Sequence, residues 1–339
     1  MPRGGDAIVP AAMRIFASIA LLPWLAGCGL FLPGDEADAG DEVGAESEDV
    51  FVAVGDQGAL LSSPDGLAWT TRTSGLGTTL NDVAFGIDDA GENTFVVVGQ
   101  AGKILFSHNG LDWLSGSSPS SRDLHSVVFH VDRFVAVGGD YSAGAETLES
   151  QDGSTWTRPE YPAPPHLLTG LATNGVTLVS IGTRQSDQQI FGLFTWAEGL
   201  GWQQRIDGAV NGARYDAVAA GIPAFALIGA GTAATSNDTI TWQPTTVVAS
   251  PPMHGLHYTA FGWIAVGDGA GILTSADAFL WTSHLSPLTA SLRAVTTSGS
   301  LHVAVGDAGA IVTSIDGANW VAATSPLAVN LRSVVHPRE

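Results

Sequence analysis

Short apolar runs that end in glycine recur along this chain at nearly equal intervals. The first reads Phe-Val-Ala-Val-Gly at 51–55, and similar runs stand at 95–99, 134–138, 178–182, 226–229, 264–267 and 303–306. A tryptophan follows each run, at Trp69, Trp113, Trp156, Trp202, Trp242, Trp281 and Trp320. About eleven residues further on comes an apolar pair three positions apart, as in Leu80 and Val83. Three landmarks in seven copies predict seven copies of one structural unit.

Each unit has room for four short strands. Its turn residues lie too close together to leave space for a helix of ten residues or more. The tryptophans lie 39 to 46 residues apart. The second predicted strand is apolar on both sides, so both faces of its sheet must be covered. A four-stranded sheet that stacks on a neighbour at each face, repeated with this period, is a propeller blade. We therefore predict an all-β fold, a seven-bladed β-propeller with four-stranded antiparallel blades.

The phase of the repeat predicts how the ring closes. The first unit begins at Phe51 with its second strand, whereas the segment 331–336 has the pattern of an innermost strand. Pairing of these two segments would complete blade 1 and would hide two strand edges that otherwise invite aggregation. We expect the propeller to span 50–336, with a short tail at 337–339.

A polar motif precedes most of the tryptophans. It reads Ser-Pro-Asp-Gly-Leu-Ala-Trp at 63–69, and the corresponding Asp or Asn residues of the regular units are Asp65, Asn109, Asp152, Asp277 and Asp316. Units four and five are degenerate, with Glu198 and Asp238 near this position. We expect the Asp or Asn to bond turn amides, the glycine to supply a positive φ and the tryptophan to pack between blades. The alternative, that these carboxylates are ligands or acids, is less favoured because a group repeated in nearly every blade usually serves the blade.

This motif resembles the Asp-box hairpin of sialidase-like propellers, shortened by one residue. It is still more similar to the repeats of the photosystem II stability/assembly-factor type and to glycine-rich repeats of bacterial envelope proteins. The resemblance covers about 50–336. It implies the propeller fold and says little about activity.

The N-terminal segment has the pattern of an export signal. Arg14 precedes an apolar run at 15–26 that is too short to span a bilayer, and the run leads into Leu-Ala-Gly-Cys at 25–28. This resembles the bacterial lipoprotein signal, which implies a signal peptide at 1–27 and a lipidated Cys28. The alternative is a signal peptide cleaved elsewhere, and translation could start at Met1 or Met13. By the same resemblance, Gly29 favours the outer membrane, so we expect lipid anchoring in the bacterial cell envelope, on the periplasmic or the surface side.

Charge is distributed unevenly along the chain. The segment 28–49 carries eight acidic residues and no basic one, which predicts a self-repelling flexible tether behind Cys28. The whole chain has 13 basic and 33 acidic residues, a net charge of −20. Such a charge argues against nucleic-acid binding and leaves the lipid anchor as the expected membrane contact. The single cysteine excludes an internal disulfide and a thiolate zinc site.

No catalytic or cofactor motif stands out in the sequence. It has no Gly-x-Ser-x-Gly elbow, no Gly-x-x-x-x-Gly-Lys phosphate loop and no sialidase Phe-Arg-Ile-Pro signature. His254 and His257 are three positions apart in a predicted strand, so we expect them on opposite faces rather than as a metal pair. We expect no metal, no cofactor and no catalytic residue. The competing function is a glycan-binding or glycan-cleaving propeller, because paired carboxylates cannot be recognised from spacing alone.

A ring of polar residues is the first candidate binding site. The residues that follow the first member of each apolar pair are Asn81, His125, Thr169, Asp216, His254, Arg293 and Arg332. In a propeller these positions share one channel mouth with the turns after the second strands. Arg293 and Arg332 should form a basic spot there, partly neutralised by the turn residues Asp56, Asp268 and Asp307.

The photosystem II assembly-factor family is thought to hold a partner polypeptide through arginines on this kind of face. The resemblance extends that role to Arg293 and Arg332 only. The alternative is that both are solvated charges at a channel rim.

The longer loops of units three and four are the second candidate. From the strand-ending glycine to the tryptophan there are 18 and 20 residues in these units, against 13 or 14 elsewhere. The additional residues lie around Tyr141 and Arg184, and the connection 158–166, with Tyr161, is expected on the same face. Insertions on one face of a repeat array often form its binding side, whereas simple loop drift is the alternative.

Together these patterns predict an envelope-anchored, non-catalytic scaffold. We expect a monomer that binds an envelope protein or an extended peptide at the channel-mouth face, and no nucleic acid.

Overall fold

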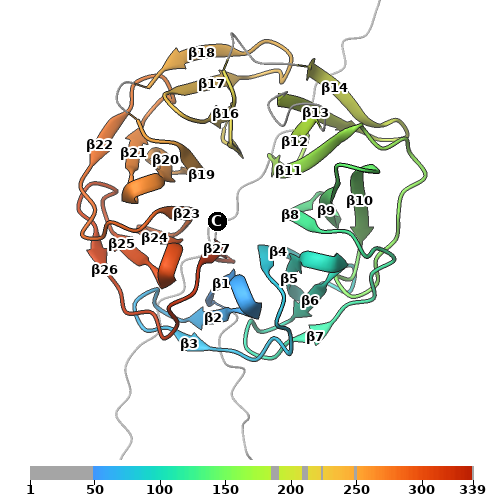
Figure 1. Ribbon diagram of the computed structural model, residues 1–339, viewed down its shortest axis with the longest axis horizontal. Helices are drawn as coiled ribbons and strands as arrows, with labels where there is room; N and C mark the ends of the chain where they lie inside the picture. The colour runs from blue at the N-terminus through green and yellow to red at the C-terminus, as the bar shows by residue number, and fades with distance from the viewer. Residues whose placement is uncertain (1–48, 185–190, 208–212, 223, 248–249, 338–339) are drawn as a thin grey trace, which may run out of the picture. The chain divides into compact units, whose positions relative to one another are not determined.

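The computed structural model describes residues 49–184, 191–207, 213–222, 224–247 and 250–337. The described residues all belong to one compact unit. In this unit, seven antiparallel sheets surround a central channel (Figure 1). The predicted seven-bladed propeller is therefore confirmed. The predicted signal peptide, Cys28 and all of the acidic tether before Asp49 lie outside the described residues.

Blade 1 is built from both ends of the ring, as the phase of the repeat predicts. From the channel outward it comprises β27 (Leu331–Val335), β1 (Phe51–Gly55), β2 (Leu60–Ser63) and β3 (Thr70–Thr71). β27 and β1 are antiparallel, with Val335 opposite Val52. This pairing closes the ring, so both segments gain a hydrogen-bonded neighbour at what would otherwise be an open edge.

The other six blades follow one another along the chain, each from its innermost strand outward (Figure 1). Blades 2 to 4 comprise β4 (Leu80–Ile87), β5 (Asn93–Gly99), β6 (Ile104–Ser107) and β7 (Leu114–Ser115); β8 (Leu124–His130), β9 (Arg133–Asp140) and β10 (Gly144–Ser150); and β11 (His166–Thr173), β12 (Leu178–Arg184), β13 (Phe191–Ala197) and β14 (Gly201–Asp207). Blades 5 to 7 comprise β15 (Ala217–Ala220), β16 (Phe225–Ile228), β17 (Thr232–Ser236) and β18 (Gln243–Thr246); β19 (Met253–Thr259), β20 (Gly262–Gly267), β21 (Ile272–Ser275) and β22 (Thr282–His284); and β23 (Leu292–Ser298), β24 (Leu301–Gly306), β25 (Ile311–Ser314) and β26 (Val321–Ala322). In blade 3 the outermost position is reduced to one antiparallel bridge between Glu149 and Thr157.

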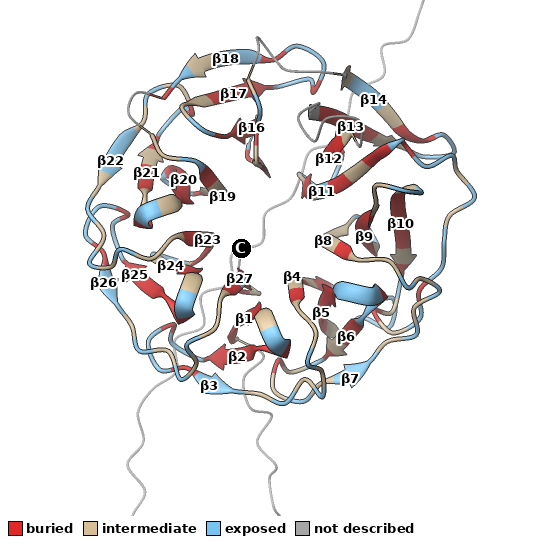
Figure 2. Cartoon of the chain, in the orientation of Figure 1, coloured by how far each residue is buried: buried red, intermediate tan, exposed pale blue. Residues whose placement is uncertain are grey.

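Alternate side chains of a second strand pack against two different blades. In β1, Phe51 lies in one core cluster with Val303 of blade 7, whereas Val52 lies in another with Val97 of blade 2. All five residues of β1 are buried, and Figure 2 shows burial concentrated on the inner strands and exposure on the outermost ones. Full burial of one such side chain stabilises by about 1.5–3 kcal/mol. The apolar runs are therefore strands because both of their faces lie between blades.

The repeated tryptophans pack against the blade that precedes their own. Trp69 of blade 1 lies in a cluster with Val303 of blade 7, and Trp156 of blade 3 lies in one with Val96 of blade 2. In six blades the indole N–H also donates to a carbonyl of the turn three residues earlier, at 2.9–3.3 Å. Trp202 of blade 4 instead donates to the hydroxyl of Thr147 in blade 3, at 2.9 Å.

The polar motif before the tryptophan forms a turn around one side-chain oxygen. Asp65 Oδ1 accepts from the backbone N–H groups of Leu67 and Ala68 at 2.9 and 2.8 Å and from the Ser63 hydroxyl at 3.0 Å. The same pattern is present at Asn109, Asp152, Asp238, Asp277 and Asp316. Although burial opposes them at Asp152, these hydrogen bonds lower the pKa values of Asp152 and Asp238 to about 2. These carboxylates stay ionised and hold the turn.

The expectation that unit five is degenerate is wrong. Asp238 forms the complete turn, with Thr239 at φ +59° where blade 1 has Gly66 at +70°. The left-handed conformation costs a non-glycine residue about 1 kcal/mol, which the hydrogen bonds of Asp238 offset. Unit four does depart from the pattern, because its third and fourth strands, β13 and β14, form a short hairpin in which Trp196 pairs with Trp202.

Close backbone contacts at the ends of the second strands shape one end of the channel. A Cβ added to Gly55 would lie 2.0 Å from the carbonyl oxygen of Asn330, so only glycine fits there. Next to this contact the register of β27 shifts between Leu331 and Ser333, which makes Arg332 a bulge residue. The innermost strands of blades 2, 3, 4, 6 and 7 shift in the same place. A bulge redirects a side chain, and here it redirects one in each of these six blades.

Candidate binding site at the channel mouth

The bulged residues of six innermost strands line one opening of the channel. A cavity of about 420 Å³ is lined by Asn81, His125, Thr169, His254, Arg293, Asp307, Asn330 and Arg332. Six of the seven side chains of the predicted polar ring are thus brought together. We term this cavity the upper mouth.

The two arginines of the upper mouth are paired with aspartates from the turns of their own blades. Arg293 donates through Nε and Nη2 to the two carboxylate oxygens of Asp307, at 2.9 and 2.7 Å. Arg332 donates through Nε to Asp56, at 2.6 Å. Asp307 and Asp56 begin the one-turn 3-10 helices η4 (Asp307–Gly309) and η1 (Asp56–Gly58). Equivalent one-turn helices, η2 (Gln100–Gly102) and η3 (Asp268–Ala270), lie in blades 2 and 6. Two-point pairing fixes the plane of a guanidinium group.

The pairing corrects the expectation of a basic spot. The charges of Arg293 and Arg332 face three carboxylates, those of Asp56, Asp268 and Asp307, so the upper mouth carries no excess positive charge. The hydrogen bond to Asp307 raises the pKa of Arg293. Although burial opposes it, the hydrogen bond from Arg332 holds the pKa of Asp56 below its usual value. The arginine side chains remain 35% and 46% exposed, which leaves them accessible to a ligand.

Two histidines and an asparagine complete the upper mouth. His254 Nε2 lies 2.7 Å from Asp268 Oδ1, and this hydrogen bond lowers the pKa of Asp268. Asn81 donates through Nδ2 to a backbone carbonyl of the next blade, at 2.7 Å. Burial lowers the pKa of His125, and the charge of Arg332 acts in the same direction. His125 is therefore neutral at pH 7, and the upper mouth presents both donors and acceptors.

The other predicted site residues do not join this cavity. Asp216 accepts a hydrogen bond from Arg214 at 2.9 Å and is not among the residues of the upper mouth. The Tyr141 hydroxyl lies 3.3 Å from that of Thr183, which links the longer hairpins of blades 3 and 4. Arg184 ends β12, and the predicted loop residues 185–190 lie outside the described residues.

Tyr161 lines a separate cavity of about 300 Å³ in blades 3 and 4. Its ring packs edge-to-face on Trp196, with centroids 5.4 Å apart. In the same cavity the buried Glu146 forms ion pairs with Arg122 at 3.2 Å and with Arg158 at 2.7 Å. Two guanidinium groups thus compensate one buried carboxylate. Of the individual residues predicted for the second candidate site, Tyr161 alone lines this cavity, which is distinct from the upper mouth.

Side chains also join neighbouring blades along the channel wall. Asp82 accepts from the hydroxyl groups of Ser333 and Ser126, at 2.7 and 2.8 Å, and from the Val127 N–H at 2.9 Å. Ser126 in turn accepts from the Leu171 N–H at 3.2 Å. Burial raises the pKa of Asp82, and these hydrogen bonds oppose that rise. The resulting belt connects blades 1 to 4.

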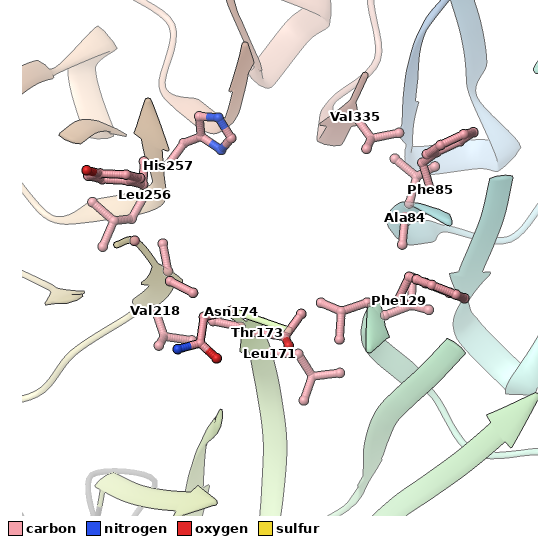
Figure 3. Close-up of a pocket in the computed structure, with 18 of the residues that line it drawn as sticks. Ala84, Phe85, Phe129, Leu171, Thr173, Asn174, Val218, Leu256, His257 and Val335 are labelled. Carbon is pink, nitrogen blue, oxygen red and sulfur yellow. The ribbon is translucent and has the colours of Figure 1, made fainter. Parts of the chain in front are cut away.

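The opposite opening of the channel is lined by apolar and polar residues together. A cavity of about 510 Å³, which we term the lower mouth, is lined by residues that include Phe85, Phe129, Leu256 and His257 (Figure 3). His254 and His257 therefore both line the channel, at its two ends, and the expectation that they face opposite sides of the strand is wrong. The bulge at His254 adds one residue to the strand, which changes the face on which positions three apart lie.

One contributor to the upper mouth, Asn330, was not anticipated. It donates to Asp56 at 2.9 Å and accepts from the Ala308 N–H at 3.0 Å, so it links blades 1 and 7. Its position directly before Leu331 in the repeat is the signal that could have identified it. Among the described residues, no group of three or more His, Cys, Asp or Glu side chains is placed to hold a metal ion. In the same part of the chain no helix is long and apolar enough to cross a membrane.

The fold and this site define a seven-bladed β-propeller with a polar channel mouth. YCF48 bound to a D1 peptide has this fold, with a TM-score of 0.61 at 16% identity over 78% of this chain and 89% of that chain. YCF48 from Cyanidioschyzon merolae gives 0.53 at 16% identity over 75% and 88%. A virginiamycin B lyase from Staphylococcus aureus, solved with quinupristin, gives 0.59 at 10% identity over 72% and 84%. At these identities the likeness establishes the fold alone. No protein-family model and no curated protein sequence matches the chain.

Proposed function

We propose that this protein is a non-catalytic scaffold of the bacterial envelope that binds an extended polypeptide segment at the upper mouth. The observation that carries the proposal is the convergence of six bulged side chains, each from a different blade, on one cavity of about 420 Å³. Lipidation of Cys28 would anchor the scaffold. Its partner would be an envelope protein.

The chemistry of the upper mouth suits a peptide. An extended peptide displays alternating N–H and C=O groups, which need both acceptors and donors. Asn81, Thr169 and the two histidines can supply these, while Arg293 and Arg332 can bind a side-chain or terminal carboxylate of the peptide. YCF48, which was solved bound to a D1 peptide, has the same fold, and this supports the proposed peptide binding.

A glycan-cleaving function has less support. It needs one carboxyl group that acts as an acid and a second that acts as a base or nucleophile. The three aspartates next to the upper mouth, Asp56, Asp268 and Asp307, are each paired with a basic side chain. Turnover of a sialoside or another glycan that disappears in Asp307→Asn would overturn the scaffold function.

A site-specific photo-crosslinker tests where the partner binds. A crosslinking amino acid at Thr169, in the full chain expressed in its native envelope, should capture a polypeptide, and mass spectrometry should map the crosslink to one short segment. The same group at Thr282, an exposed residue of the outermost strand β22, is the control. Equal crosslinking at both positions would contradict binding at the upper mouth.

Paired substitutions then test the two arginines. Arg293→Gln combined with Arg332→Gln should weaken binding of the mapped segment at least about tenfold, because charge-assisted hydrogen bonds to a ligand contribute about 1.5–3 kcal/mol. Arg133→Gln is a matched control, since Arg133 is 31% exposed and is also paired with acidic groups, but at the start of β9. Unchanged affinity in the double variant would remove both arginines from the site.

A further inference from the structure

The exposed apolar side chains of the ring gather on the face opposite the upper mouth. Each blade is an antiparallel meander, so its first and third turns lie at the same end of the sheet. A hydrogen bond from the Asp89 N–H to the Gln151 carbonyl joins a first turn of blade 2 to a third turn of blade 3. We term this end of the ring, which surrounds the lower mouth, the lower face.

The first turns of five consecutive blades each expose one large apolar side chain. These are Ile87, Val131, Val176, Ile222 and Phe261, with exposures between 55% and 84%. The third turns of blades 1, 4, 5, 6 and 7 add Leu67, Leu200, Ile240, Leu280 and Ile315. Among the described residues of the turns and loops at the opposite end of the ring, Leu285 alone is a large apolar residue with such exposure. Scattered apolar residues need no explanation, but ten on one face form a patterned surface.

One of these turns keeps an apolar residue at a conformational cost. Val131 has φ +60°, a region that β-branched residues rarely adopt. The corresponding turns of blades 4 and 7 place Gly175 and Gly299 at φ +80° and +58°. Glycine would relieve the strain at position 131, so the presence of a valine at the tip points to a role for its side chain.

The apolar character continues into the channel. Figure 3 shows Phe85, Phe129 and Leu256 around the hollow of the lower mouth, and Ile222 of the first turn in blade 5 also lines this cavity. The exposed first turns therefore surround an opening in which these apolar side chains lie beside polar ones such as Asn174 and His257. The upper mouth, in contrast, is lined by polar and charged residues.

We propose that the lower face is a membrane-contact surface whose first turns insert into a bilayer of low surface charge. Both ends of the ring leave through this face, because β1 begins there at Phe51 and β27 ends there at Val335. Cys28 precedes Asp49 by 21 positions, and a flexible chain of that length spans about 25 Å on average. A lipid on Cys28, which is part of the function proposed above, would hold the lower face close to the membrane.

The charges of the lower face specify the kind of bilayer. Asp89, Glu92, Asp132 and Glu198 are exposed at these turns, with Arg133 as a basic neighbour. An anionic surface would repel this excess of carboxylates. A zwitterionic surface permits the apolar tips to insert. Contact in this orientation leaves the upper mouth open to water and to a partner.

A single fluorescent label tests which face touches the bilayer. The full chain with Cys28→Ser has no other cysteine and no lipid, so each variant carries a single thiol and the result does not depend on lipidation. Phe261→Cys and Ala308→Cys then place one thiol on the lower or the upper face. With phosphatidylcholine vesicles, a polarity-sensitive label at 261 should shift to shorter wavelength and be quenched by spin-labelled lipid, whereas the label at 308 should not. Replacement of a third of the lipid by phosphatidylglycerol should weaken the effect.

Two further variants separate contact from folding. Val131→Gly should raise the unfolding midpoint, because it relieves the positive φ, and should reduce quenching at position 261 several-fold, because one apolar tip is lost. Val131→Asp with Ile222→Asp should abolish the quenching. Equal quenching at 261 and 308, or a shift at 261 that depends on protein concentration without vesicles, would overturn the proposal, the latter in favour of a second copy of the chain. Failure of peptide binding at Arg293 and Arg332 would leave these outcomes unaffected.

Discussion

The hydroxyl of Ser333 donates a 2.7 Å hydrogen bond to the carboxylate of Asp82, 251 positions earlier in the chain. The bond crosses from β27, the last strand, to β4, the first complete innermost strand. It therefore reinforces the closure of the ring beside the backbone pairing of β27 with β1. The same carboxylate also accepts a hydrogen bond from the hydroxyl of Ser126 in blade 3, so one side chain connects three blades.

Asp82→Ala should destabilise the ring by about 2–4 kcal/mol, because the substitution leaves the backbone N–H groups of Val83 and Val127 without their acceptor in the channel wall. Ser333→Ala, which removes one donor from the same carboxylate, should cost about 1 kcal/mol. Equilibrium unfolding in urea measures both. A loss for Asp82→Ala no larger than that for Ser333→Ala would show that the belt has little energetic weight.

Gly306→Ala should lower the stability by about 3 kcal/mol or more and should displace Arg293. An added Cβ at Gly306 would lie 2.0 Å from the carbonyl oxygen of Ser291, which is backbone and cannot move aside cheaply. Gly77→Ala is the control, because no atom lies within 4 Å of its added Cβ, and it should change stability by less than about 0.5 kcal/mol. Unfolding midpoints and the peptide affinity of the two variants test the link between this glycine and the upper mouth.

The architecture could be predicted from the sequence because its signals are local and repeated. A run such as that of β1, apolar on both sides, has to lie between two other sheets, and its spacing to Trp69 recurs to within one residue in five of the seven units. The phase of the first unit likewise predicts that 331–336 completes blade 1, and the structure pairs the two segments with Val52 opposite Val335. These properties depend on which residues are buried, and burial is encoded directly in apolar pattern.

The details of the site depend on geometry that the pattern does not encode. A one-residue bulge decides that His254 and His257 both line the channel. The two-point contact between Arg293 and Asp307 depends on how the turn of η4 folds back over the innermost strand. Thr239 shows a third limit, because a residue other than glycine adopts a positive φ when its neighbour Asp238 makes enough hydrogen bonds.

The free energy of unfolding should fall in mild acid because His257 is held neutral in the folded protein. Burial, with the charge of His302 acting in the same direction, lowers the pKa of His257 to about 4, against about 6.5 in an unfolded chain. Between these values the unfolded state binds a proton that the folded state does not, so stability decreases as the pH falls from 6.5 to 4 and is unaffected above 6.5. The contribution is at most about 3 kcal/mol.

His257→Gln should remove that part of the pH dependence. The difference in unfolding free energy between pH 7 and pH 4.5 should be smaller in the variant by about 1–3 kcal/mol. Other histidines with lowered pKa values, such as His130, remain in both proteins and cancel in the comparison. The same pH profile in both proteins would assign the acid sensitivity to residues other than His257.

The turns after the second strands of blades 6 and 7 allow a matched test of backbone strain. Ala308 has φ +54°, and Gly269 occupies the equivalent position at φ +60° with no atom within 4 Å of an added Cβ. Ala308→Gly should therefore stabilise the ring by about 0.5 kcal/mol, because the relief of strain exceeds the entropy that glycine adds to the unfolded chain. Gly269→Ala should destabilise it by about the same amount.

A higher thermal unfolding midpoint for Ala308→Gly and a lower one for Gly269→Ala would confirm this assignment. Both substitutions leave the side chains of Asp307 and Asp268 in place beside Arg293 and His254, so peptide affinity should not change in either variant. A lower midpoint for Ala308→Gly together with a higher one for Gly269→Ala would instead mean that the flexibility of glycine in the unfolded chain outweighs the strain at Ala308. In that case alanine at this position would be the more stable choice, and the positive φ would have no measurable cost in these turns.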